Sequence, residues 1–167
     1  MHLARLPVKV TENESDNFLR SKLSWIEQLT ANQQVEGSSP SERVIMNERK
    51  FKKLAKIALP YALNNDRAKR HVSLILVRNK VISIGANQLK SHPQAKKIGY
   101  RYDEVHSELD ALLRCKERQN LQLVNFRFNR FAATRLSRPC DLCTPWCKLI
   151  FDKIYYTTPT GFERLVF

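Results

Sequence analysis

Three of the four cysteines in this 167-residue chain lie in the segment RPCDLCTPWC, which runs from Arg138 to Cys147. Thiols at this spacing can belong to a structural zinc finger, a redox pair, a disulfide or a catalytic metal site. A structural finger needs a second pair of ligands at short spacing. The histidines do not supply such a pair, because they are scattered along the chain as His2, His71, His92 and His106.

The redox and disulfide interpretations fit the cysteines less well than a metal site does. Four cysteines are too few for a disulfide-stapled fold of this length. Cys140 and Cys143 form a C-x-x-C pair, but a thioredoxin-like motif follows an early strand, whereas this pair lies near the end of the chain. We expect Cys147, one helical turn further on, to be a buried thiol, and Cys115 to be structural.

The segment His106-Ser107-Glu108 provides the best partner for the cysteine pair. One imidazole and two thiolates suit zinc, and three protein ligands leave the fourth position open, as in catalytic sites. The ligands are expected at helix N-termini, which favour thiolate over thiol. Glu108 would lie near the metal without binding it, where a carboxylate can move protons during hydrolysis. The sequence thus predicts one zinc per chain, held by His106, Cys140 and Cys143, with Glu108 as the catalytic residue.

Hydrophobic periodicity and turn residues predict an α/β order of elements that positions these side chains. The expected helices cover residues 47–63, with a bend or end near Pro60, then 103–118 and 140–153. The expected strands are 71–78 and 81–87, joined by a tight turn at Asn79-Lys80, then 121–133, 154–158 and 162–167. Residues 88–102 read as a polar, basic loop, and Phe131 suggests a bulge in the third strand. So few residues follow the fourth strand that a fifth must be antiparallel.

Composition divides the chain into two parts. Residues 1–42 are predicted to form an N-terminal helical extension, with a helix over 16–30 and a polar linker, and residues 43–167 to form the main domain. The net charge is +13 overall, and the Lys/Arg excess lies entirely in the second part. Such a basic domain favours a phosphate-bearing partner. The chain has no long apolar stretch, so we expect a cytoplasmic protein without membrane contact.

The order H-x-E, strand, P-C-x-x-C is the signature of zinc nucleobase deaminases, present here as His106-Ser107-Glu108 and Pro139-Cys140-Asp141-Leu142-Cys143. From about residue 48 onward the chain resembles the cytidine and deoxycytidylate deaminase superfamily, particularly its short phage-type members. The resemblance implies a three-layer α-β-α fold with a mixed sheet of four to five strands. It also implies hydrolysis at C4 of cytosine, a cyclic amidine, with Glu108 transferring protons and ammonia leaving.

The resemblance extends to substrate contacts and self-association. It implies that Asn87, in GANQLKSHPQ, binds a sugar hydroxyl, and that Ser107, where alanine is commoner, lines the base edge. Lys90 and His92, with Lys96, Lys97 and Arg101, form either a phosphate-binding lid or a solvated loop. Such folds often form homo-oligomers, and Leu19, Leu23 and Trp25 are candidates for that contact.

Three function classes stay open at the level of sequence. The first, which we favour, is deamination of cytosine to uracil in a free cytidine or deoxycytidine nucleoside or nucleotide. The second is editing of cytosine or adenine in single-stranded DNA or RNA. The third is a binding or structural protein without activity. By resemblance, an antiparallel fifth strand argues against tRNA adenosine deaminases and standard deoxycytidylate deaminases, but it occurs in free cytidine deaminases and in some toxin deaminases of polynucleotides.

Overall fold

The structure, a computed structural model, describes residues 46–100 and 103–167. The expected helix over 16–30, the linker and the candidate self-association residues Leu19, Leu23 and Trp25 lie outside the described residues. The division at residue 42 and the homo-oligomer therefore stay predictions. Within the described part of the chain, none of the helices has both the length and the apolar character needed to cross a membrane.

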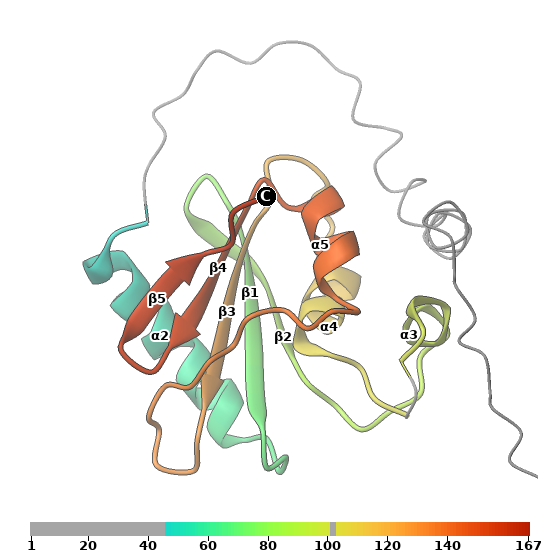
Figure 1. Cartoon of the computed structure of the whole chain (residues 1–167), viewed down its shortest axis with the longest axis horizontal. Helices are drawn as coiled ribbons and strands as arrows, with labels where there is room; N and C mark the ends of the chain where they lie inside the picture. The colour runs from blue at the N-terminus through green and yellow to red at the C-terminus, as the bar shows by residue number, and fades with distance from the viewer. Residues whose placement is uncertain (1–45, 101–102) are drawn as a thin grey trace, which may run out of the picture.

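A single five-stranded sheet carries the fold (Figure 1), and its strands lie in the order β2-β1-β3-β4-β5. β3 and β4 are parallel, and the other neighbouring pairs are antiparallel. The sheet is mixed, and its fifth strand is antiparallel, both as predicted. In chain order the elements are α2 (Glu48–Leu63), β1 (Arg70–Val77), β2 (Lys80–Ala86), α3 (Pro93–Ile98), α4 (Ser107–Arg114), β3 (Gln122–Phe128), α5 (Thr144–Ile150), β4 (Lys153–Thr158) and β5 (Gly161–Arg164).

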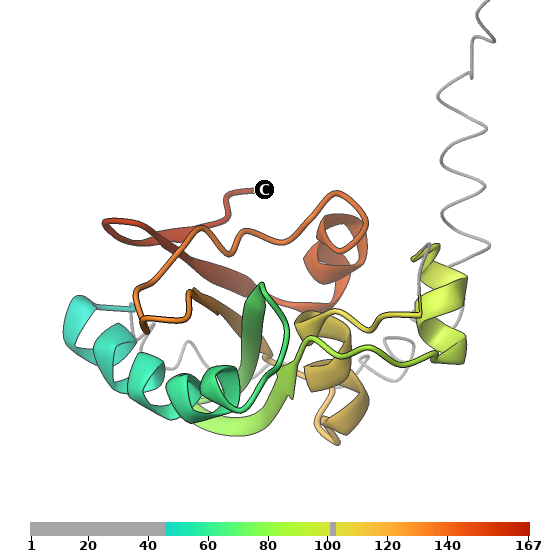
Figure 2. The same cartoon turned by 90° about the horizontal axis from the view of Figure 1, so that it is seen from below.

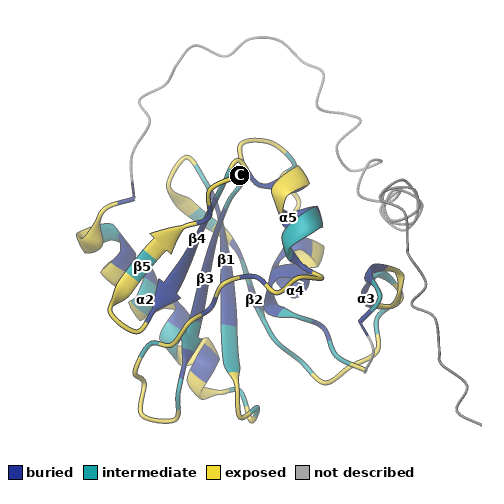
Figure 3. Cartoon of the chain, viewed as in Figure 1, coloured by how far each residue is buried: buried dark blue, intermediate teal, exposed yellow. Residues whose placement is uncertain are grey.

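Helices cover both faces of the sheet, which confirms the predicted three layers (Figure 2). On one face, α2 packs through Phe51, Leu54 and Ala58 against a cluster that includes Leu74 and Phe126. On the other face, α4 and α5 share a second cluster with alternate residues of the same strands, among them Ile75, Leu123 and Ile154. The central strands are therefore buried along most of their length (Figure 3).

The sequence predicts a bend or an end near Pro60, but helix α2 continues through Pro60 to Leu63, so the helix does not end there. Proline removes one intrahelical hydrogen bond, but residues spaced three and four apart pack on the sheet and hold the last turn in place. At the other end the Asn47 side chain accepts a hydrogen bond from the Lys50 amide at 2.9 Å, which caps the helix.

The β1–β2 hairpin turns at Arg78 and Asn79, one residue earlier than predicted, because Val77 pairs with Lys80. Both turn residues have positive φ, 45° and 70°, as the mirror-image turns that suit hairpin twist require. The bulge predicted near Phe131 is also misplaced. β3 ends at Phe128 and Phe131 is exposed beyond it, while the register shift lies in the β1–β2 pairing between Ile75 and Leu76.

Part of the segment predicted to be a basic loop is the short helix α3. Its caps explain why: the His92 side chain accepts a hydrogen bond from the Gln94 amide at 3.3 Å, and Gly99 ends the helix with φ of 96°. Ala95 and Ile98 are buried in spite of the charged sequence around them. The next two helices begin later than predicted, at Ser107 and Thr144, with His106 and Cys143 in the N-cap positions.

Candidate metal centre and pocket

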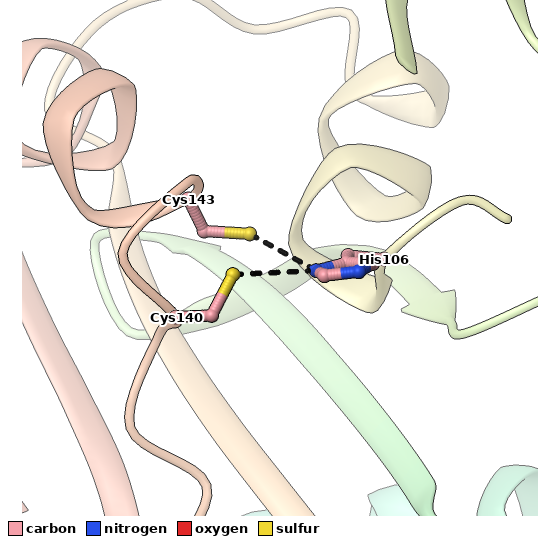
Figure 4. A group of neighbouring side chains, drawn as sticks. All are labelled: His106, Cys140 and Cys143. Carbon is pink, nitrogen blue, oxygen red and sulfur yellow. Dashed lines mark hydrogen bonds between the residues drawn. The ribbon is translucent and has the colours of Figure 1, made fainter. Parts of the chain in front are cut away.

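Two helix N-termini bring the predicted ligands together. His106 is the N-cap residue of α4 and Cys143 that of α5, and both helices lie on the same face of the sheet. The Nδ1 atom of His106 lies 3.3 Å from Cys143 Sγ and 3.6 Å from Cys140 Sγ. Figure 4 shows both sulfurs pointing at the imidazole. The amides of Cys143 and Thr144 both donate to Cys140 O, closing the turn that holds the two sulfurs side by side.

The donor set fits a tetrahedral metal ion. Zinc binds sulfur at about 2.3 Å and imidazole nitrogen at about 2.0–2.1 Å, so tetrahedral ligands N and S lie about 3.5 Å apart. The observed separations of 3.3 and 3.6 Å match this value. Among the described residues, His106, Cys140 and Cys143 are the one group of His, Cys, Asp and Glu side chains with this convergence. Cys147 and Trp146 are instead fully buried in the core.

Two neighbours fix the orientation of the ligands. Glu104 Oε1 lies 3.3 Å from His106 Nε2, on the side of the ring away from the sulfurs, and Glu104 Oε2 accepts from Arg67 at 3.3 Å. Tyr100 stacks on the His106 ring with centroids 4.2 Å apart, and its hydroxyl lies 3.0 Å from Cys143 Sγ. Carboxylates in the position of Glu104 commonly set the tautomer and direction of a ligating histidine.

The two thiols differ in their electrostatic surroundings. Hydrogen bonding from the Cys143 thiol, and then from His106, lowers the pKa of Cys140 to about 4 in spite of its partial burial. Burial raises the pKa of Cys143 well above the usual thiol range. For His106 burial lowers the pKa, but hydrogen bonding to Cys140 and the charges of Glu108 and Cys140 outweigh it and raise the pKa to about 9. Without a cation, the Cys140 thiolate is therefore paired with a protonated His106, and zinc binding would release protons from His106 and Cys143.

Glu108 lies beside this group and is only 5% exposed. Asn125 Nδ2 donates to its Oε1 atom at 2.9 Å, and Ser107 Oγ donates to Oε2 at 3.3 Å. Burial raises the pKa of Glu108 above the usual carboxyl range, because desolvation disfavours the charged form. A carboxyl group in these surroundings can hold a proton as well as release one.

A pocket of about 310 Å³ opens over the site. Its volume is at the lower end of the range for small-molecule sites, ~300–1,000 Å³. Three cationic side chains contribute to its wall, and desolvation and the charge of Arg127 lower the pKa of His71 to about 4, so this ring is neutral at pH 7. The lining residues are Arg67, Lys69, His71, Asn87, Gln88, Glu104, His106, Ser107, Glu108, Arg138 and Cys140.

Of the predicted substrate contacts, Asn87 and Ser107 line this pocket. The Asn87 side chain is tied to the start of β1: Oδ1 accepts from the His71 amide at 2.9 Å, and Nδ2 donates to Lys69 O at 2.8 Å. The second Nδ2 hydrogen has no partner among the described residues and is available to a ligand. Ser107 is buried, and its Oγ lies 2.8 Å from Ser73 Oγ, so its hydroxyl points into the protein rather than toward a substrate.

Lys90 and His92 do not line the pocket. Lys90 instead pairs with the buried Asp110 at 3.5 Å, and His92 caps α3. Asp110 also accepts from the Ala86 amide at 3.1 Å and from Gln88 Nε2 at 3.0 Å. This carboxylate thus fastens the chain after β2 to α4, and Lys90 takes part in that anchor.

Several residues of the site carry no motif that singles them out. Glu104 and Tyr100 precede His106 in a segment whose sequence reads as charged helix start and basic loop. Arg67 and Lys69 lie in the irregular link before β1, and reach the pocket because β1 begins beside it. Asn125 is the exception, since an amide between buried apolar residues of a strand is unfavourable unless its hydrogen bonds are satisfied.

No family model matches this chain, and no curated protein matches it significantly. Solved structures similar to it include two deaminases. One is the dCMP deaminase of cyanophage S-TIM5, in complex with dCMP and dUMP, at 14% identity and a TM-score of 0.48, covering 67% of this chain and 83% of that one. The other is the cytidine deaminase of Mycobacterium leprae, at 13% identity and a TM-score of 0.46, covering 72% of this chain and 94% of that one.

Proposed function

We propose that this chain is a zinc-dependent hydrolytic deaminase that converts cytosine to uracil in a free cytidine or deoxycytidine nucleoside or nucleotide. The observation that carries the proposal is a convergence on one pocket. Two members of a three-ligand group with tetrahedral spacing, His106 and Cys140, border this pocket. The buried carboxylate of Glu108, on the helix that begins after His106, borders it as well. A structural zinc site would need a fourth protein ligand, and none joins the group within the described part of the chain.

The ligand group would hold zinc through His106 Nδ1 and the sulfurs of Cys140 and Cys143. Bound zinc supplies Lewis-acid activation of water near neutral pH. In the net reaction a water oxygen bonds to C4, the bond from C4 to the amino nitrogen breaks, and ammonia leaves. Glu108 takes both protons from the water and delivers one to the ring nitrogen N3 and the other to the leaving amino nitrogen. The peptide unit of Ser107 lines the edge of the base.

The pocket cations favour a phosphate-bearing substrate. Lys69 and Arg138 are exposed at the wall, and Arg67 is half-buried and paired with Glu104. We assign phosphate recognition to these three side chains rather than to Lys90 and His92. Asn87, with its remaining hydrogen, is the candidate for a sugar hydroxyl.

One observation favours the second candidate, deamination within single-stranded nucleic acid. A neighbouring groove of about 380 Å³ shares Arg67, Asn87 and Gln88 with the pocket. The half-exposed ring of Tyr61 also lines it. A nucleotide adjacent to the reacting one would fit there, with an aromatic ring available for stacking. By resemblance, the antiparallel β5 is compatible with either candidate.

The test uses the zinc-loaded full chain and measures ammonia release. The substrates are cytidine, deoxycytidine, their monophosphates, adenosine, and a single-stranded oligonucleotide containing cytosine. We expect the highest kcat/KM with cytidine monophosphate or deoxycytidine monophosphate. Activity confined to the oligonucleotide would favour the second candidate, and no release from any cytosine substrate would overturn the proposal.

Glu108→Gln is the matched catalytic variant, because it keeps the shape of the side chain and removes the proton carrier. We expect it to retain stoichiometric zinc and lose about 10²–10⁴-fold in kcat, the range for positioned acid–base groups. Glu117→Gln, at an exposed position after α4, serves as the control with unchanged activity. Cys140→Ala should lose zinc and activity together. Activity of Glu108→Gln within a few-fold of the parent would contradict the role of this carboxylate.

A further inference from the structure

Asn125 occupies an unfavourable place for an amide. It lies in the middle of β3, between the buried residues Val124 and Phe126, and is itself 1% exposed. Asparagine is depleted in strands, and a buried amide costs free energy unless its hydrogen bonds are satisfied. The contacts of the amide must therefore offset this cost.

All the hydrogen-bonding groups of the Asn125 side chain are used. Nδ2 donates to Glu108 Oε1 at 2.9 Å and to Ser137 O at 3.4 Å. Oδ1 accepts from Ser73 Oγ at 2.8 Å. These partners fix the orientation of the amide, because the flipped arrangement would place Oδ1 against two acceptors, one of them the carboxylate.

The same residue connects the two halves of the site. Ser137 lies three positions before Cys140, and its Oγ donates to Asn125 O at 2.8 Å. Ser73, on the neighbouring strand β1, also contacts Ser107 at the start of α4 at 2.8 Å. Asn125 thus bonds to the α4 carboxylate on one side and to the segment leading to the cysteine ligands on the other.

We propose that Asn125 is a positioning residue that holds the Glu108 carboxylate in register with the ligand group. The inference rests on the proposed function and adds a residue to it. A glutamate side chain has three rotatable bonds, and the Asn125 donor is the shortest hydrogen bond that holds its carboxylate. Because misplacement of a reacting group by about 1 Å can cost on the order of 10²-fold in rate, loss of this donor should affect turnover more than substrate binding.

The test compares variants that separate positioning from stability. Asn125→Asp keeps the shape but replaces the donor with an acceptor facing Glu108. Asn125→Ser shortens the side chain beyond reach of Glu108 without adding charge, and is the second variant in case the first fails to fold. Ser83→Ala is the control: Ser83 is buried, lies on β2 and donates to Ala111 O of α4 at 2.6 Å, without contacting Glu108.

Each full-length, zinc-loaded variant is measured for kcat and KM with the best cytosine substrate, for zinc content and for thermal unfolding. Asn125→Asp and Asn125→Ser should lose about 10²-fold in kcat, with KM within about threefold and zinc still stoichiometric. Ser83→Ala should lose stability and keep kcat.

A kcat within about threefold of the parent in a folded Asn125 variant would overturn the inference. So would parallel losses of zinc, stability and kcat, which would make the residue structural only. Either result leaves the proposed function standing as long as the parent chain releases ammonia. A parent chain without activity on any cytosine substrate would instead overturn the proposed function, and the role of Asn125 with it.

Discussion

Tyr100 contacts two of the three candidate ligands at once. Its ring stacks on His106 at an interplanar angle of 15°, and its hydroxyl lies 3.0 Å from the sulfur of Cys143. It is 6% exposed, and burial, then the charge of Cys143, raises its pKa, so the phenol stays protonated. A protonated hydroxyl can donate to a thiolate sulfur and stabilise its charge, while the ring limits rotation of the imidazole.

We predict that Tyr100→Phe weakens zinc binding by roughly 10-fold, the lower end of the range for residues that orient metal ligands. The variant keeps the stacking and removes only the hydroxyl, so Tyr100→Leu, which removes both contacts, should weaken binding further. Competition with a chromogenic chelator measures both affinities. Tyr61→Phe, on the exposed side of α2, is the control. Equal zinc affinity in Tyr100→Phe and the parent would show that the hydroxyl has no part in ligand orientation.

At the residue scale, the sequence predicts the metal ligands, because few residue types can bind zinc. It misses the residues that only have to lie close to those ligands. His106, Cys140 and Cys143 could be predicted because zinc restricts the ligand types and their spacing, and the three side chains do converge. Glu104, Tyr100 and Asn125 act by hydrogen bonds or stacking, which many residue types can provide. Their roles depend on which segments the fold brings together, and no local pattern records that.

The position of α4 depends on a close approach to β2. A Cβ atom at Gly85 would lie 2.1 Å from Ala111 N and 2.5 Å from Ser107 O, both backbone atoms of the helix. The helix therefore packs on β2 at a distance that only glycine permits. Since α4 carries Glu108 and begins at His106, this contact sets the height of both side chains above the sheet.

We predict that Gly85→Ala destabilises the chain by about 3 kcal/mol, the upper end of the range for overpacked cores, because backbone atoms cannot turn away as a side chain can. The midpoint of urea unfolding measures the loss, and zinc affinity should fall as α4 shifts. Gly161→Ala is the matched control, since a Cβ there meets no atom within 4 Å. Similar stability of the two variants would contradict the close-packing argument.

Elements with strong periodicity were predictable, and those set by caps or tertiary contact were less so. The strands and the long helix α2 follow from apolar spacing. Helix α3 escapes such analysis, because two buried residues in a basic segment give too weak a period, and its ends depend on His92 and Gly99. Likewise, the late starts of α4 and α5 reflect the N-cap positions of His106 and Cys143, which place those side chains just outside each helix.

At the scale of the whole molecule, net charge predicts the kind of partner but not the place where it binds. The sequence carries 29 Lys and Arg against 16 Asp and Glu, and much of that excess lies on exposed faces, such as Lys53 and Lys56 on α2. The sequence predicts a phosphate-binding lid around Lys90 because the main domain is basic and this basic loop follows Asn87, the expected sugar contact. The cations that line the pocket come instead from two distant segments, the link before β1 and the approach to Cys140.

Removing positive charges at the pocket should therefore lower kcat/KM for a monophosphate more than for its nucleoside. We predict that Lys69→Met and Arg138→Met each lower kcat/KM for the monophosphate by about 10- to 100-fold, because hydrogen bonds to charged groups contribute about 1.5–3 kcal/mol. The nucleoside should be nearly unaffected. Lys53→Met, remote from the pocket, is the control, and Lys90→Met tests the lid prediction directly. A loss at Lys90 with none at Lys69 would support the predicted lid.

If only an oligonucleotide responds to these changes, the salt dependence of binding distinguishes the two candidate functions. The logarithm of the binding constant for a single strand should fall with the logarithm of the salt concentration, with a slope of about −0.7 per phosphate neutralised, and each charge removed should make that slope less steep. A monophosphate engages too few phosphates to give a steep slope, so a steep slope would favour editing of a polymer.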